Sequence, residues 1–513
     1  MAHIHPLSCS CTKSELDLFE VPPTQTTITD GRWVEYHPVA SLAESSPIEF
    51  DIPGAGEEFT DLSQTKLYVK AKIVLPNGND LPDNAKVGPV NLWLQSLFSQ
   101  VTVTVAGKDI TDSTNCYPYR AYLETLLNFG SEAKQSQLTS ELFYQDTPGR
   151  LHLVDPYPTD QGAVANEGLV KRANMTRNSR EVDLIGPLHV DLFHQDRFLL
   201  SKVDVKIKLH RSKHQFCLMS PGDQFKIVIT EAAVFLRKVN LLPTYQLSIE
   251  SQLNKQTAKY ALKRVQLKPF TIPRGNHSVS SDNLFLGQVP KRVAIALVDN
   301  AAFQGSFGTN PFNFQHFNLN YISLCVNGQE VPHKALTPNF AEGQYIRSYM
   351  NLFGTTGKQG QDSGNLIARS DYDKGFTVWC YDLSPDLCGL GGDHFNIIRQ
   401  GNLRLELHFA QALDQTVVAV VLAEFDNLLE IDRQRTSALT TATRDGHETD
   451  VRRLTERQEH GTSPPRSLCF RSASEASEFI ERHFDIDAPV VDIELVMRQI
   501  ARTLEDFDRA FND

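Results

Sequence analysis

Short sequence patterns in the first part of the chain recur, in the same order, in its second part. The matched pairs are residues 50–53 (FDIP) with 270–273 (FTIP), Lys66 with Lys291, 105–110 (VAGKDI) with 326–331 (VNGQEV), 120–123 (RAYL) with 347–350 (RSYM), and 205–209 (VKIKL) with 403–407 (LRLEL). Each match alone is weak, but together they indicate a duplicated unit. The sequence therefore predicts two domains of similar fold, over residues 47–245 and 246–433.

Both units show apolar and polar residues in strict alternation. The inward-facing sets are Leu67, Val69, Ala71 and Ile73, then Val101, Val103 and Val105, then Val203, Val205, Ile207 and Leu209, then Leu403, Leu405 and Leu407. A period of two is typical of antiparallel strands with one buried and one wet face. Long helices of the βαβ kind are missing, which disfavours a parallel sheet. The predicted fold class is all-β: two tandem eight-stranded antiparallel jelly rolls, since an immunoglobulin domain needs only about 100 residues.

Short helices are expected in the loops of these units. In the first unit, Tyr119, Tyr122, Leu123, Leu126 and Leu127 recur at helical spacing. Such an apolar stripe predicts an amphipathic helix packed on the core.

The chain ends differ from the body. Residues 1–46 are predicted to form an irregular arm, because they carry turn residues and few core residues. From 434 to 513 there are eleven Arg and no Lys, against 22 Lys and 17 Arg before. Residues 434–472 are predicted to be a disordered linker, and 473–513 a helical tail unrelated to the body. That helix would either dock on the body or bind a partner, and the sequence leaves both open.

Composition and charge exclude several classes of protein. The net charge is −12, which is opposite to that of a protein held mainly by phosphate contacts. The longest apolar run, 417–423, is far shorter than the roughly 20 residues that span a bilayer. Residues 1–12 lack the features of a secretory signal, so we expect none. Eight cysteines in 513 residues are sparse, which favours a reducing compartment over a disulfide scaffold.

Four segments carry a resemblance to a known family. They are residues 89–101 (PVNLWLQSLFSQV), 117–127 (YPYRAYLETLL), 196–200 (DRFLL) and 345–349 (YIRSY). Over residues 14–433 the chain resembles the double jelly-roll major capsid proteins of eukaryotic double-stranded DNA viruses. It looks most similar to those of Polinton/Maverick and adintovirus-type elements, including copies integrated in animal genomes. These motifs describe a scaffold and no reactive centre.

The resemblance implies a structural protein and no enzyme. Three chains with two jelly rolls each would form a homotrimer of pseudo-hexagonal outline, and such capsomers would tile an icosahedral shell. Interfaces of this obligate kind bury about 2,000–5,000 Å². The implied partners are neighbouring capsomers and penton or minor capsid proteins, without strong direct nucleic-acid binding and without a membrane span. The implied location is the virion capsid, after assembly in the cytoplasm or nucleus.

Three isolated motifs resemble functional sites, but each has a simpler structural explanation. His3, His5, Cys9 and Cys11 offer four zinc ligands, but their spacing matches no finger pattern. Residues 354–358 (GTTGK) hint at a phosphate loop, yet Leu352 and Gln359 break the pattern, so we expect a surface loop. His447-Glu448 begins a metalloprotease-like string that Val451 interrupts.

A basic strip and two sequons complete the candidates. Lys202, Lys206, Lys208 and His210 share one strand face, which we interpret as a solvated outer face, with a polyanion-facing or inter-subunit strip as the alternative. Sequons begin at Asn174 and Asn276, and both are expected to be unused because no secretory signal is predicted.

Two other function classes stay open. A tandem jelly-roll enzyme, of the copper monooxygenase or glycan amidase type, would need converging histidines or paired carboxylates. His194, His210 and His214 are close in sequence, but a predicted strand at 205–209 should keep them apart. A glycan-binding β-sandwich would need exposed aromatic residues on a sheet face. The sequence therefore predicts no catalytic, cofactor-binding or metal-binding residue and no cofactor.

Overall fold

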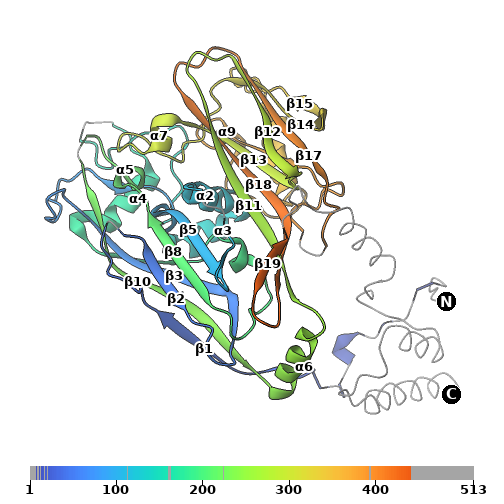
Figure 1. The fold of residues 1–513 in the computed structure, drawn as a ribbon. Helices are drawn as coiled ribbons and strands as arrows, with labels where there is room; N and C mark the ends of the chain where they lie inside the picture. The colour runs from blue at the N-terminus through green and yellow to red at the C-terminus, as the bar shows by residue number, and fades with distance from the viewer. Residues whose placement is uncertain are drawn as a thin grey trace. The chain divides into compact units, whose positions relative to one another are not determined.

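A computed structural model describes residues 7–440 apart from 9–10, 12, 17, 20, 45, 112–113, 160–162, 223 and 392–393, and without the side chains of 332–333 and 440. Two β-sandwiches follow one another in this part of the chain (Figure 1). Both belong to one compact unit, Met1–Thr443. The predicted tail, His447-Glu448, and His3, His5 and Cys9 lie outside the described residues.

Within its described residues, the first roll contains eight main strands. They are β1 (Ile28–Tyr36), β2 (Ile48–Ile52), β3 (Phe59–Val74), β5 (Phe98–Val105), β6 (Lys108–Asp109), β7 (Val182–Gly186), β8 (Val205–Arg211) and β10 (Lys226–Leu241). They form two antiparallel sheets, β1-β10-β3-β7 and β2-β8-β5-β6. A short ribbon of β4 (Gly88–Pro89) and β9 (Leu218–Met219) lies beside them.

The second roll repeats this order. Its strands are β11 (Ala258–Ile272), β12 (Ser278–Gln288), β13 (Arg292–Asp299), β14 (Leu319–Val326), β15 (Gln329–Leu336), β16 (Val378–Asp382), β17 (Gln400–Phe409) and β18 (Val417–Ile431). The sheets are β11-β18-β13-β16 and β12-β17-β14-β15. In both rolls the first, eighth, third and sixth main strands form one sheet, and the second, seventh, fourth and fifth form the other. This arrangement confirms the predicted double jelly roll.

Four of the five sequence matches fall on equivalent elements of the two rolls. The turn at 105–110 joins β5 to β6 as that at 326–331 joins β14 to β15, and the strands β3 and β8 match β13 and β17. The pair 120–123 and 347–350 lies in the helices Tyr117–Asn128 and Ile346–Thr355. The match between 50–53 and 270–273 is wrong, because the former ends the second strand of its roll and the latter ends the first.

Two predictions about the chain ends need correction. Residues 28–36, assigned to an irregular arm, form β1 and pair with β10 along its length. Residues 437–440, assigned to a disordered linker, form β19 (Ser437–Thr440) on the edge of β18. Both segments form strands because they pair with strands that are distant in the sequence or belong to a different predicted segment. The other predicted boundaries stay predictions.

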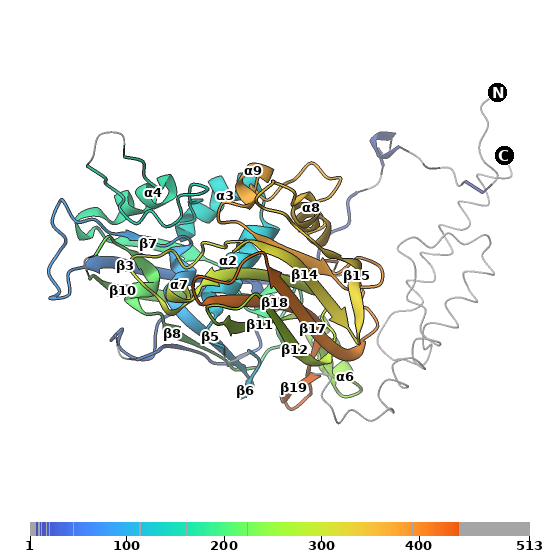
Figure 2. The same ribbon diagram turned by 90° about the horizontal axis from the view of Figure 1, so that it is seen from above.

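Helices occupy the loops between strands. They are α1 (Trp93–Ser96), α2 (Tyr117–Asn128), α3 (Ser131–Gln135), α4 (Glu167–Thr176), α5 (His214–Cys217), α6 (Pro243–Leu253), α7 (Asn300–Gln304), α8 (Ile346–Thr355) and α9 (Arg369–Tyr372), with 3-10 turns η1 (Ser14–Leu16), η2 (Gln137–Glu141), η3 (Arg177–Ser179) and η4 (Asp191–His194). Figure 2 shows α4, α3, α9 and α8 along one side of the sandwiches. The predicted helix is α2, and its five apolar residues are buried. Among the described residues, no helix is long and apolar enough to cross a membrane.

Candidate functional site

In the sheet β11-β18-β13-β16, the strands β13 and β16 and the first part of β18 are buried on both faces. Ile295 and Val421 point into the core of the second roll. Ala296 and Val420, their neighbours along the strands, belong to the core that fills the first roll and the seam between the rolls. A strand covered on both sides needs apolar residues at every position, which explains the unbroken apolar run at 417–423.

Aromatic rings fill this seam around α2. Tyr122 of the first roll stacks on Phe312 of the second, with ring centroids 4.1 Å apart. Tyr119 stacks on Phe303 of α7 at 5.3 Å and meets Phe314 at 6.5 Å. Buried aromatic pairs contribute about 0.5–1.5 kcal/mol beyond their area. The two rolls are therefore joined by a shared hydrophobic core.

Buried polar groups also cross the seam. Asp146 accepts a hydrogen bond from Arg172 at 2.6 Å and one from Asn310 of the second roll at 3.0 Å. The Lys134 ammonium donates to the carbonyl oxygens of Leu126 at 2.7 Å and of Asn365 at 2.6 Å. Burial, together with nearby Lys358, lowers the pKa of Lys134 to about 7. These bonds fix the angle between the rolls because they are directional.

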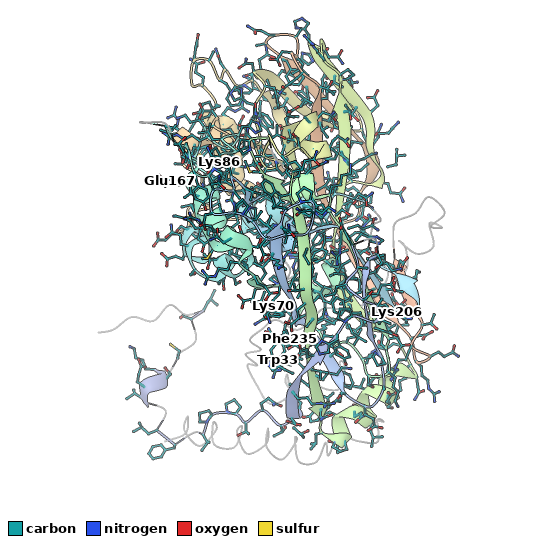
Figure 3. The ribbon with its side chains drawn as sticks, turned by 90° about the vertical axis from the view of Figure 1, so that its left-hand side faces the viewer. Trp33, Lys70, Lys86, Glu167, Lys206 and Phe235 are labelled. Atoms are coloured by element: carbon teal, nitrogen blue, oxygen red, sulfur yellow. The ribbon has the colours of Figure 1, made fainter. Side chains whose placement is uncertain are left out.

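Each roll also carries exposed apolar residues on its surface. On the outer face of β1-β10-β3, Trp33 is 52% exposed and Val228 is 39% exposed, beside the half-buried pair Tyr68 and Phe235. We call these four residues the β1 face. Figure 3 shows Trp33, Phe235 and Lys70 one above another on this face.

A second exposed apolar surface lies on the loop between β16 and β17. It consists of Leu387, Leu390, Phe395, Ile397 and Ile398, which we call the 383–399 patch. Ile397 is 85% exposed. Exposed apolar groups on one contiguous loop are typical of interaction sites.

The predicted surface loop at 354–358 is partly buried. Its first two residues end α8, and the Thr355 and Thr356 hydroxyls donate to carbonyl oxygens of the preceding turn. Lys358 is 9% exposed and donates to the Gly364 carbonyl oxygen. The segment lies at the C-terminal end of α8, where carbonyl oxygens repel a phosphate. The absence of a phosphate site stays a prediction, and only the predicted exposure of the loop is wrong.

Three residues of the basic strip, Lys206, Lys208 and His210, lie on the outer face of β8. The placement of Lys202 on this strand is wrong, because Lys202 lies in a turn before β8 with φ of 63°. Lys206 is exposed, Lys208 and His210 are half-buried, and Lys208 pairs with Glu49 at 2.8 Å. This pattern agrees with the predicted solvated face. Asn174 is exposed on α4 and accepts a hydrogen bond from Tyr157, and Asn276 is half-buried.

The three histidines considered for an enzyme lie in different surroundings. His214 pairs with Glu44 at 2.5 Å, and His210 lies on β8. His194 instead lies beside His189 and Glu124, two residues that the sequence did not single out. His189 is five residues before His194, but Glu124 lies on another element. Sequence spacing alone therefore could not predict that the three residues meet.

Comparisons with known proteins agree with this fold. No family model matches the chain. The uncharacterized protein F54H12.2 of Caenorhabditis elegans is 26% identical over 430 residues, which cover 81% of this chain and 98% of that protein. A chain in the Sputnik virophage structure matches with a TM-score of 0.55 at 13% identity, over 88% of this chain and 99% of that chain.

A chain of the PBCV-1 virus capsid matches with a TM-score of 0.51 at 12% identity, over 83% of this chain and 100% of that chain. These structural neighbours are viral double jelly-roll major capsid proteins. At such low identity the likeness shows the fold, and the fold of this chain is therefore the double jelly roll of viral capsid proteins.

Proposed function

We propose that the protein is a major capsid protein, a structural subunit that forms trimers of pseudo-hexagonal outline, and that these tile an icosahedral shell. The likeness to viral capsid proteins supports a structural role over an enzymatic one. We also propose, from the sequence motifs at 89–101 and 117–127, that the chain is related to the capsid proteins of Polinton/Maverick-type elements.

The contact between the two rolls carries the proposal. The loop 187–204 of the first roll, which contains η4, packs on β11, the first strand of the second roll. Asp191 accepts a hydrogen bond from the backbone N–H of Val265 at 3.2 Å. The Tyr260 hydroxyl accepts one from the backbone N–H of Leu200 at 3.1 Å. The contact between the rolls is thus made by a loop of the first roll and by the first strand of the second roll.

Each roll has an equivalent of the contact surface that the other roll uses at the seam, and these two equivalent surfaces are exposed. In the second roll, the loop equivalent to 187–204 lies between β16 and β17 and carries the 383–399 patch. In the first roll, the strand equivalent to β11 is β1, which carries the exposed Trp33. If one chain contacts the next as its first roll contacts its second, the 383–399 patch of one copy packs near the β1 face of the next. Such a heterologous contact forms a ring when its rotation closes, here after three chains and six rolls.

The test is the mass of the full-length protein in solution, measured by size-exclusion chromatography with light scattering and followed by electron microscopy. We expect trimers with a hexagonal outline. Ile397→Asp and Trp33→Asp should each give folded monomers, because both residues are exposed in one chain and an unpaired carboxylate is costly in a buried contact.

The matched control is Leu247→Asp on α6, because Leu247 is 71% exposed but lies on neither surface. It should stay trimeric. A wild-type protein that is a monodisperse monomer would refute the trimer. Trimers that survive both Ile397→Asp and Trp33→Asp would instead refute the assigned surfaces.

The exposed aromatic residues also favour a second candidate, a glycan-binding β-sandwich. Trp33, Tyr68 and Phe235 lie on one sheet face, as stacking on sugar rings requires. A glycan array and titration calorimetry with the full-length protein distinguish the two. Saturable sugar binding lost in Trp33→Ala, from a protein that stays monomeric, would favour this candidate.

A further inference from the structure

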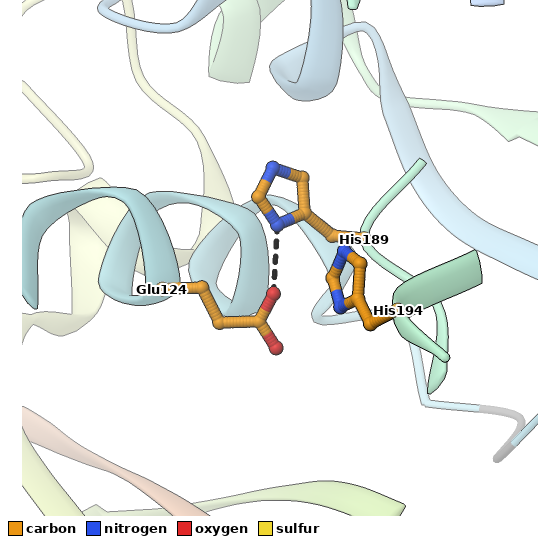
Figure 4. Close-up of side chains that lie close together, drawn as sticks. All are labelled: Glu124, His189 and His194. Carbon is orange, nitrogen blue, oxygen red and sulfur yellow. Dashed lines mark hydrogen bonds and ion pairs between the residues drawn. The ribbon is translucent and has the colours of Figure 1, made fainter. Parts of the chain in front are cut away.

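Two histidines and a glutamate meet beside the seam between the rolls. Glu124 lies on α2, His189 precedes η4, and His194 is the last residue of η4. The Glu124 Oε2 and His189 Nδ1 atoms are 2.7 Å apart, and one ligand atom from each of the three residues lies within 4.8 Å of the others. Figure 4 shows both imidazole rings next to the Glu124 carboxylate. In the part of the chain that the structure describes, no other such group occurs.

Two imidazoles and one carboxylate are a ligand set that zinc uses in proteins, with water in the fourth position. Tetrahedral bonds of the usual length put ligand atoms about 3.4 Å apart. The three ligand atoms lie within 4.8 Å of one another, so binding requires the side chains to move closer together. A bound cation would replace the hydrogen bond between Glu124 and His189 with two coordinate bonds.

Neighbouring groups already orient these ligands. Arg120 donates to Glu124 Oε1 at 2.9 Å and to Asp191 at 2.6 Å, which leaves Glu124 Oε2 directed toward the histidines. The Tyr117 hydroxyl accepts a hydrogen bond from the backbone N–H of His189 at 3.1 Å. Carboxylate ligands in metal sites are commonly held by such outer partners. Glu124 and Asp191 place two carboxylates beside the Arg120 guanidinium, and the Lys263 ammonium also acts on His194.

The burial of the three residues gives a cation both a route and a dry site. Glu124 and His189 are buried, at 8% and 4% exposure, whereas His194 is exposed. We propose that Glu124, His189 and His194 bind a divalent cation of the zinc class. The ion would tie the loop 187–204 to α2 at the point where that loop packs on β11. This site does not depend on the proposed capsid role.

The test uses the full-length protein, stripped with a chelator and titrated with Co²⁺. We expect about one equivalent to give the visible absorption of tetrahedral cobalt, and Zn²⁺ to displace it. Zn²⁺ should also raise the unfolding temperature, because it binds only the folded chain. His194→Ala and Glu124→Gln should abolish both effects. Glutamine keeps an oxygen for Arg120, and the metal-free melting curve of the exposed His194→Ala variant verifies its fold.

Two controls assign the site. His210→Ala on β8 should keep the full cobalt signal, because His210 is outside the group. A His3→Ala/His5→Ala variant should also keep it. The proposal is overturned if the wild type binds no stoichiometric metal, if His194→Ala retains it, or if the His3→Ala/His5→Ala variant loses it.

Discussion

Ala106 and Asn327 have the same backbone conformation at equivalent turns of the two rolls, each with φ of 51°. Each donates its N–H to a backbone carbonyl oxygen: Ala106 to that of Asp204, just before β8, at 2.9 Å, and Asn327 to that of Asn402 in β17 at 3.1 Å. A glycine with positive φ follows in both turns. Two consecutive positive φ values make the tight turn that matches strand twist. The duplication therefore extends to single hydrogen bonds.

This equivalence predicts that Ala106→Asn stabilises the protein. Alanine in the left-handed region costs roughly 1–2 kcal/mol, and asparagine is tolerated there. We expect the free energy of unfolding to rise by roughly 0.5–1 kcal/mol, measured by urea denaturation. Lys108→Asn, two residues on in the same hairpin, is the control and should give no gain. An unchanged midpoint for Ala106→Asn would contradict the explanation.

The stack of Phe312 on Tyr122 predicts a large loss for Phe312→Ala. Phe312 is fully buried in the seam, so the variant leaves a cavity that neither roll can fill alone. We expect a loss of about 3–5 kcal/mol in the free energy of unfolding. Leu247→Ala, at a residue that is 71% exposed, should change it by less than about 0.5 kcal/mol. Similar losses from both variants would mean that the seam is not a shared core.

Asp146→Asn tests a buried ion pair of the first roll, Asp146–Arg172, whose carboxylate also accepts a hydrogen bond from Asn310 across the seam. Asp146 and Arg172 are 1% and 0% exposed, so removing the carboxylate charge leaves the guanidinium buried without a counter-charge. We expect a loss of about 3–5 kcal/mol, measured by thermal or urea unfolding. The exposed Asp183→Asn on β7 is the control. A loss in the free energy of unfolding no larger than that of the control would mean that the hydrogen bonds at this site matter and the charge does not.

Lys134 predicts a dependence of stability on pH. Burial lowers its pKa from 10.5 to about 7 in the folded protein. Between these values the unfolded chain binds a proton that the folded chain has released, so stability rises with pH from about 7 upward. The slope from this group is at most about 1.4 kcal/mol per pH unit.

Urea unfolding of the wild type and of Lys134→Met at pH 7, 8 and 9 measures this slope. The variant should lose the rise, whereas Lys171→Met, at an exposed lysine of α4, should keep it. Parallel curves for the wild type and Lys134→Met would show that Lys134 stays charged when buried.

The sequence by itself determined the alternating strands such as β3, β5, β8 and β17, and the helix α2, because each pattern depends on neighbours in the chain. The ordered repetition of these patterns indicated the duplication. Alternation sets which face of a strand is apolar, as at Leu67–Ile73 in β3, and helical spacing sets the buried stripe of α2. The repeated turns at Ala106 and Asn327 are equally local. These signals were sufficient for the double jelly roll.

Only the tertiary structure decided what depends on remote partners. β1 is a strand because Trp33 lies opposite Arg237, and β19 because Leu439 lies opposite Leu429. The second buried face of β18 and the meeting of Glu124 with His189 likewise follow from packing between distant segments. The same holds for the exposed surfaces, since a local pattern fixes which side of a strand is apolar but not what covers it.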